Sequence, residues 1–111
     1  MPFIETSKLT PKEPLPGWSG RFFHSTHMTF SYYDIEPGTP LHLHHHPEEE
    51  VWHVVEGELE MVIGDVTRIL RAGEAAIVPA NVAHRAAALQ RCRAIVVDHP
   101  VRTRVGGVDI G

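Results

Sequence analysis

The distribution of glycine and proline most constrains how this chain of 111 residues can fold. Nine glycines and nine prolines divide it into short segments, and nothing longer than one turn shows the period of an amphipathic helix. Several segments show instead the two-residue alternation, or the β-branched and aromatic content, of strands. We therefore expect an all-β protein whose short strands and tight turns form a sandwich, a jelly roll or a small barrel.

Individual strands can be placed from their residues. The predicted strands include residues 28–36, two segments within residues 50–65 that break at Gly57, and residues 92–98. Residues 83–89 have helical propensity, but the segment is short and uncapped, so we predict strand or loop there. Residues 1–20 contain four prolines and are predicted to be an extended N-terminal arm. Residues 21–111 are predicted to be a single β-barrel domain.

The composition argues against several classes of protein. A net charge of −4 does not favour nucleic acid as a partner, because nucleic acid selects for basic patches. No apolar run approaches the roughly 20 residues that a membrane span needs, and the N-terminus lacks the layout of a signal peptide. The lone Cys92 rules out an internal disulfide and fits a reducing compartment. We expect a cytoplasmic protein.

A cluster of metal-capable side chains lies between Leu41 and Glu50, where ten residues include four histidines and three glutamates. On an extended strand His42, His44 and His46 share one face. Residues two apart lie roughly 6.6–7 Å from each other, and residues four apart roughly 13 Å. An imidazole nitrogen must approach a metal such as zinc to about 2.1 Å. One ion can therefore be shared by His42 and His44 or by His44 and His46, but by all three only if the strand bends sharply.

The spacing of this segment resembles the first signature of the cupins. The matching positions are Gly38, His44, His46, Glu50 and Gly57, which are separated by five, one, three and six residues, respectively. A second segment resembles the second cupin signature: Gly73 is followed, after five residues, by Pro79 and then by His84. Asn81 stands where the family usually has glycine, but asparagine tolerates the left-handed backbone that such a turn demands. Ala88 stands where the family often has asparagine.

The resemblance is to small single-domain cupins of the RmlC-like superfamily, and it implies a jelly-roll barrel, or double-stranded β-helix, that is usually dimeric. It also implies a metal at the bottom of an open mouth. The implied metal ligands are His44, His46, Glu50 and His84. Glu50 is in addition the residue that we assign to catalysis, and His42 is left at the rim of the pocket.

The implied ligand set suits a divalent transition metal such as Fe, Mn, Ni, Co, Cu or Zn. Four protein ligands on an octahedral ion leave two positions for water, substrate or dioxygen. A single carboxylate leaves the site with a charge of about +1, and the ion can polarise a carbonyl or activate water. The competing interpretation is a solvated loop, in which Glu48 and Glu49 beside the histidines give only weak, adventitious metal affinity.

Further residues are expected around this site. If Glu50 points into the barrel, alternation directs Trp52 and Val54 inward and His53 outward, with Trp52 as a pocket wall or a plain core aromatic. Of Tyr32 and Tyr33, one points inward and one outward. The predicted substrate pocket comprises Trp52, Tyr32, His42 and Met61. The predicted barrel lining comprises Met28, Phe30, Met61 and Ile63.

Three functions fit such a site. The first is a metalloenzyme that acts on a small oxygenated substrate, by dioxygenase chemistry or by isomerisation or hydration of a sugar acid. The layout resembles cupins that convert unsaturated uronates to linear keto acids, although Glu50 stands where those often carry glutamine and matches metal-binding dioxygenases instead. The second is a non-catalytic cupin that binds or senses a metabolite or sugar. The third is metal storage, with His42 and His45 as extra donors. The expected partners are a small-molecule substrate and a second copy of the chain.

Overall fold

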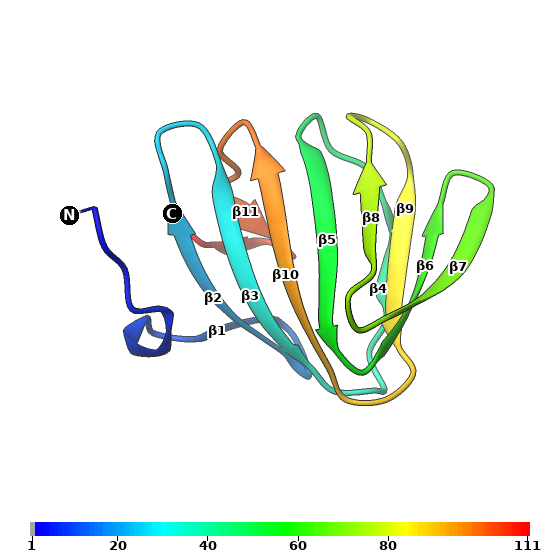
Figure 1. Ribbon diagram of the computed structural model, residues 1–111. Helices are drawn as coiled ribbons and strands as arrows, with labels where there is room; N and C mark the ends of the chain where they lie inside the picture. Colours follow the sequence, from blue (N-terminus) through cyan, green and yellow to red (C-terminus); the bar gives the residue numbers. More distant parts are fainter. Residues whose placement is uncertain (1) are drawn as a thin grey trace.

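The computed structural model describes residues 2–111, so Met1 lies outside the described residues. Within that range the regular secondary structure is β-strand apart from one turn of 3₁₀ helix at Thr6–Lys8. The strands, labelled in Figure 1 except for β12, are β1 (Lys12–Leu15), β2 (Trp18–His24), β3 (Thr29–Ile35), β4 (Leu41–His44), β5 (Glu49–Glu56), β6 (Glu58–Ile63), β7 (Val66–Arg71), β8 (Ala75–Val78), β9 (His84–Ala88), β10 (Cys92–His99), β11 (Arg104–Val105) and β12 (Val108–Asp109). Among the described residues, no helix has the length and apolar character needed to cross a membrane.

Two antiparallel sheets enclose one core. The larger has the strand order β1-β2-β3-β10-β5-β8 and the smaller β4-β9-β6-β7, while β11 and β12 form a separate short hairpin (Figure 1). The core combines Trp52 and Val96 from the larger sheet with Leu59, Met61 and Ala86 from the smaller one. The inner faces of both sheets therefore share a single apolar layer. The predicted all-β jelly roll is confirmed.

Strand β5 alternates as predicted between the core and the solvent. Glu50, Trp52 and Val54 are buried, whereas His53 and Val55 are exposed. The segment with helical propensity is strand β9, which pairs with β4 and β6. The helical propensity of its alanines is overridden by tertiary context, because β9 lies between β4 and β6 and pairs with both.

The predicted barrel lining was wrong for two of its four residues. Phe30 belongs to the outward face of β3, where its ring stacks on Phe23 at a centroid distance of 4.8 Å. Met28 precedes the strand and is exposed. Met61 and Ile63 do pack in or against the core. The inner face of β3 carries the buried residues Thr29, Ser31, Tyr33 and Ile35, so polar residues point inward and aromatic residues outward on part of this strand.

The first 20 residues, predicted to be an extended arm, contain strand β1 and the beginning of β2. Leu15 pairs with Trp18 across a turn at Gly17, whose φ of 82° is a left-handed value that glycine adopts without strain. This segment is therefore the edge of the larger sheet in the structure. Leu15 also packs against the core.

The turn at Asn81, within the segment that resembles the second cupin signature, contacts the loop that carries His46. Asn81 is the only non-glycine residue with positive φ among residues 2–111, at 65°, which agrees with its expected left-handed conformation. Its backbone N–H donates a hydrogen bond of 2.8 Å to the carbonyl of His46. The turn before β9 thus holds in place the loop that carries His46.

Candidate metal centre and cavity

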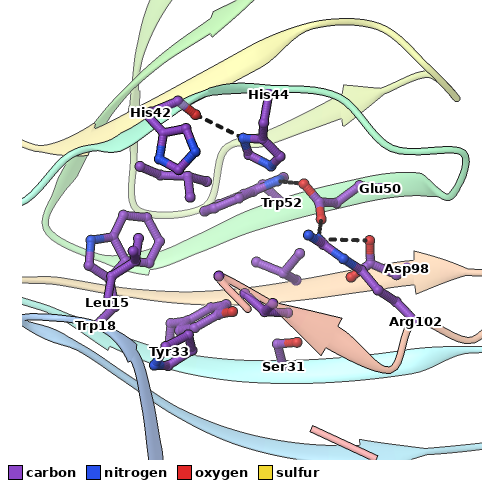
Figure 2. A pocket seen from close by; sticks show the side chains of 15 residues that line it. Leu15, Trp18, Ser31, Tyr33, His42, His44, Glu50, Trp52, Asp98 and Arg102 are labelled. Atoms are coloured by element: carbon purple, nitrogen blue, oxygen red, sulfur yellow. Dashed lines mark hydrogen bonds and ion pairs between the residues drawn. The ribbon is translucent and has the colours of Figure 1, made fainter. Parts of the chain in front are cut away.

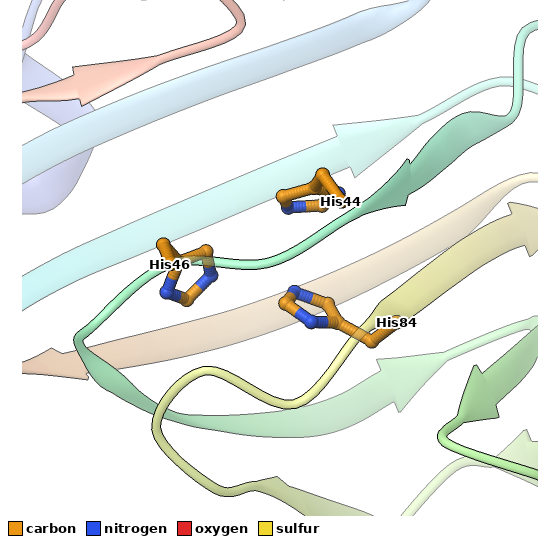
Figure 3. A group of neighbouring side chains, drawn as sticks. All are labelled: His44, His46 and His84. Atoms are coloured by element: carbon orange, nitrogen blue, oxygen red, sulfur yellow. The ribbon is translucent and has the colours of Figure 1, made fainter.

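Three histidines from two distant parts of the chain meet at one end of the barrel (Figure 3). His44 is the last residue of β4 and His84 the first of β9, and the two are direct partners in the antiparallel pairing. His46 follows in the loop before β5. One ring nitrogen from each lies within 4.8 Å of the others. The structure therefore brings together all three predicted histidine ligands.

The orientation of each ring is fixed by its own backbone neighbourhood. In every case Nδ1–H donates to a main-chain carbonyl two residues away. The bonds run from His44 to His42 at 2.8 Å, from His46 to Glu48 at 3.1 Å and from His84 to Val82 at 2.9 Å. This pattern places the proton on Nδ1 in the neutral ring, so that Nε2 carries a lone pair as it does in histidines that bind metal. In His46 that nitrogen lies 3.4 Å from Nη1 of Arg102.

Glu50 completes the group from β5. Its side chain is 2% exposed, with Oε1 3.4 Å from Nε2 of His84 and Oε2 3.5 Å from Nε2 of His46. The indole N–H of Trp52 donates a hydrogen bond to Oε1. Trp52 is thus one of the groups that hold this carboxylate in place.

These donors fit a divalent transition metal. Lone pairs of carboxylate and imidazole face one another at 3.4–3.5 Å, an arrangement that requires protons or a cation between them. Nε2 of His84 is fully buried and has no hydrogen-bond partner among the described residues, although unpaired buried polar atoms are costly. Nitrogen donors with one carboxylate are the set that first-row divalent ions prefer.

The electrostatics agree with the roles of ligands. Burial acts to raise the pKa of Glu50, but interactions with the neighbouring side chains of His46, His84, Asp98 and Trp52 outweigh burial and hold that pKa well below its usual value. Glu50 is therefore ionised. Burial lowers the pKa of His44, which favours the neutral ring that metal ligation requires. For His84 burial also acts to lower the pKa, but contacts with Glu50 and with the Val82 carbonyl outweigh it and raise that pKa.

Two charged residues that the sequence analysis did not identify lie beside this group. Nη1 of Arg102 donates a hydrogen bond of 3.0 Å to Oε2 of Glu50, and lies 3.8 Å from Oδ1 of Asp98. Asp98 is the direct partner of Glu50 across β10 and β5. Its inward position could have been read from the alternation of residues 92–98, in which it follows Val96 on the buried face. Arg102 lies in the irregular segment after β10, where no periodicity gives a side-chain direction.

Asp98 and Glu50 form a buried pair of carboxyl groups. Burial, followed by the negative charge of Glu50, raises the pKa of Asp98 to about 9, because two facing carboxylates cannot both ionise cheaply. Oδ1 of Asp98 is buried and has no hydrogen-bond partner among residues 2–111. Asp98 thus keeps its proton to a higher pH than an exposed aspartic acid does.

A cavity of about 110 Å³ adjoins the metal-capable group (Figure 2). One end is apolar and is formed mainly by Leu15, Trp18, Leu41, Trp52 and Val96. The other end is polar and is formed by His44, Glu50, Asp98 and Arg102. The cavity can therefore receive a small molecule with an apolar body and an anionic group.

The predicted pocket residues are distributed unequally around this cavity. Trp52 lines it, and His42 lies at its edge. Tyr33 lines it as well, whereas Tyr32 is on the outward face of β3 and does not. Met61 is buried in the core and is not part of the lining. Tyr33, and not Tyr32, is therefore the tyrosine at the cavity.

Known proteins share this architecture. An RmlC-like cupin from Shewanella frigidimarina superposes with a TM-score of 0.86 at 22% identity, covering 92% of this chain and 93% of that chain. KdgF from Halomonas sp. superposes with a TM-score of 0.84 at 22% identity, covering 90% of this chain and 94% of that chain.

One relative is similar in sequence. The H2HPP isomerase of Bacillus subtilis is 45% identical over 62 residues, which are 55% of this chain and only 25% of that protein. The chain thus spans about a quarter of that relative's length.

The family assignment rests on a match that covers more than half of the chain. The family model described as "Cupin domain" matches residues 31–98, a range that includes His44, His46, Glu50 and His84. The same range runs from the third residue of β3 to Asp98 in β10. The chain belongs to the cupin domain family.

Proposed function

We propose that this protein is a metal-dependent isomerase that moves a proton within a small carboxylate-bearing enol or unsaturated oxo acid. The observation that carries the proposal is the convergence, at one cavity, of the histidine cluster, the buried acid Asp98 and the partly buried guanidinium of Arg102. The cavity volume of about 110 Å³ limits the part of the substrate that is enclosed to a few heavy atoms.

Arg102 is the group that binds the substrate's carboxylate. Its side chain is 15% exposed and reaches the polar end of the cavity. A guanidinium presents paired N–H donors that match a carboxylate geometrically, and burial strengthens the attraction. Nη1 is directed to Glu50 and Nε to the carbonyl of Arg104, which leaves Nη2 to address the substrate.

Asp98 is the group that exchanges a proton with the substrate. In the conversion of an enol to its ketone, the carboxyl proton of Asp98 adds to a carbon of the double bond, whose π electrons form the new C–H bond. The enol hydroxyl loses its proton, and the electrons of that O–H bond form the C=O bond. The proton that leaves oxygen restores Asp98, so the composition of the substrate is unchanged. A buried carboxyl placed next to a cation suits this general acid–base role.

His44, His46, His84 and Glu50 would hold the divalent ion, and a bound ion supplies Lewis acidity toward a substrate oxygen. The name of the H2HPP isomerase, which is 45% identical over 62 residues, supports isomerisation over oxygen insertion. The buried Asp98 supports it as well, because proton transfer needs such a group at the cavity.

The test follows proton exchange and oxygen separately. Metal-loaded protein in D₂O is given small 2-oxo acids and unsaturated uronates while ¹H NMR records deuterium incorporation and an electrode records dioxygen. We expect exchange or isomerisation without oxygen uptake. Asp98→Asn should lower the rate at least about 100-fold with unchanged metal content, and Arg102→Gln should mainly raise KM. Oxygen uptake in step with substrate loss would favour a dioxygenase, and tight binding without turnover would favour a binding protein.

We also propose that the protein forms a homodimer through the outward face of the larger sheet. Five apolar side chains form one cross-strand row on that face: Phe23, Phe30, Val97, Val51 and Ile77. Ile77 is 62% exposed, and Val55 on the neighbouring strand is 47% exposed. Burying such a row between two copies would remove apolar surface from water.

A further inference from the structure

The backbone of Arg102 is held by the hydroxyl of one buried residue. Thr29 is the first residue of β3 and is 0% exposed. Its Oγ1 accepts a hydrogen bond of 2.8 Å from the N–H of Arg102 and donates one of 3.1 Å to the carbonyl of Arg102. Because the N–H and C=O flank the same Cα, two bonds to a single oxygen atom define the direction in which the side chain of Arg102 leaves the backbone.

Few other contacts hold the backbone at this position. Arg102 lies between β10 and β11, in a segment without sheet pairing. The nearby backbone bond from Ile110 N–H to the Thr103 carbonyl holds the following residue. At the far end of the side chain, Nε of Arg102 donates to the carbonyl of Arg104 at 3.0 Å and Nη1 donates to Glu50 at 3.0 Å. The hydroxyl of Thr29 is thus the contact that joins the backbone of Arg102 to the larger sheet, whereas its guanidinium reaches the same sheet through Glu50.

Thr29 is itself anchored next to the site. It is the direct partner of Asp98 on β10, which in turn is the direct partner of Glu50 on β5. On its other side, Oγ1 of Thr29 lies 2.7 Å from Nδ1 of His24, the last residue of β2. The clamp on Arg102 is therefore continuous with the strands that carry the acidic residues of the cavity.

We propose that Thr29 is a positioning residue that aims the Arg102 guanidinium at the anionic group of the substrate. This inference rests on the proposed function, in which Arg102 binds the carboxylate. Replacing the hydroxyl by a methyl group removes both bonds to Arg102 and leaves its N–H and C=O without these partners. The segment then loses its attachment to β3, and the guanidinium samples directions that miss the cavity.

The experiment compares variants by their affinity for pyruvate, a small 2-oxo acid used as a probe, measured calorimetrically on metal-loaded protein. We expect Thr29→Val to weaken binding about 10-fold or more, as loss of ligand orientation commonly does, and Thr29→Ser, which keeps the hydroxyl, to stay close to the parent. Thr67→Val on the exposed strand β7 is the matched control and should bind normally. Metal content and the circular dichroism spectrum should be unchanged in all three, and Thr29→Ala replaces Thr29→Val if the latter does not fold.

A double-mutant cycle distinguishes aiming from general support of the fold. If Thr29 acts through Arg102, Thr29→Val should add no further loss of affinity to an Arg102→Gln protein. Additive losses, or parent-like binding by Thr29→Val, would overturn the proposal. If Arg102→Gln itself binds pyruvate normally, the assignment of Arg102 as the anchor has failed. The positioning role is then decided by the ¹⁵N NMR signal of Arg102 Nε–H, which should shift or broaden in Thr29→Val and be preserved in Thr29→Ser. An unchanged signal in Thr29→Val would overturn it.

Discussion

His44 and His84 are direct partners in the pairing of β4 with β9, although the two strands come from opposite halves of the chain. Their ring centroids are 4.3 Å apart. Residues opposite each other on antiparallel strands have their side chains on the same face. The strand pairing therefore brings these imidazoles together without help from loop conformation, and His46 joins them from a loop held by Asn81.

The first prediction concerns which histidines hold the metal. His44→Ala and His84→Ala should each abolish stoichiometric metal, because each removes an Nε2 that converges on the same point. His42→Ala is the control and should retain the metal, since His42 contributes its carbonyl, and not its ring, to the orientation of His44. Metal-to-protein ratios after dialysis, measured by mass spectrometry, provide the check. Metal loss in His42→Ala equal to that in His44→Ala would contradict the assignment.

The second prediction concerns the indole N–H that holds Glu50. Trp52→Phe removes the hydrogen bond to Oε1 of Glu50 while it keeps an aromatic ring in the cavity wall. Loss of such a supporting contact typically weakens metal affinity about 10–100-fold. Trp18→Phe is the matched control, because its indole donates to the carbonyl of Thr39 instead. Competition with a chromophoric chelator measures both affinities. Equal affinities in the two variants would argue against a role of Trp52 at the site.

The third prediction separates backbone conformation from steric overlap at two turns. Gly57 and Gly73 have nearly the same φ, 85° and 86°, so alanine at either should cost about 1–2 kcal/mol of folding free energy for the left-handed backbone. At Gly57 a Cβ would also collide with the backbone of Arg91, whereas nothing lies within 4 Å at Gly73. Gly57→Ala should therefore lose about 1–3 kcal/mol more than Gly73→Ala, as measured by urea unfolding. Equal losses would show that the loop around Arg91 moves away freely.

The fold and the metal-capable residues could be predicted because both depend on short-range patterns. Turn residues, strand alternation and the spacing of His44, His46 and Glu50 all leave a trace in the sequence. The tyrosine at the cavity was mistaken because β3 has its apolar pattern partly reversed: Ser31 faces the interior while Phe30 faces outward. Period-two reasoning cannot determine which side is the core when both faces contain aromatic residues.

Arg102 shows a different limit of sequence reasoning. It has no periodic neighbours, and its direction is set by the hydroxyl of Thr29, which lies on a strand far away in the sequence. A contact of this kind follows from the tertiary arrangement alone. Asp98 is an intermediate case, since the alternation of β10 would have placed it on the buried face beside Glu50.

The fourth prediction tests the proposed homodimer. Ile77→Glu places a charge in the exposed part of the apolar row on the larger sheet and should convert a dimer to a monomer, because burying an unpaired carboxylate between two copies is unfavourable. Val66→Glu is the control, since Val66 is similarly exposed, at 64%, but lies on β7 of the other sheet. Sedimentation equilibrium measures both masses. A monomeric parent protein, or a dimeric Ile77→Glu, would contradict the proposed interface.

The fifth prediction concerns the buried thiol of Cys92. Burial, with the charges of Asp34 and Glu56, raises the pKa of Cys92 to about 11, whereas an unfolded cysteine has a pKa of about 8.5. Only the thiolate reacts readily, so iodoacetamide at pH 8 should leave the folded protein unmodified. Ser25→Cys, which adds an exposed thiol, is the positive control and should be labelled once per chain.

The same shift makes part of the protein's stability depend on pH. Between pH 8.5 and 11 the folded state keeps a proton on Cys92 that the unfolded state has lost, so this contribution is complete below about pH 8.5 and disappears as the pH rises toward 11. From pH 8 to 10.5 the parent should therefore lose about 2 kcal/mol more stability than Cys92→Ala. Both proteins share every other group that titrates in this range, so the difference isolates the thiol. Parallel losses of stability in urea unfolding would show that Cys92 ionises in the folded state as easily as in the unfolded chain.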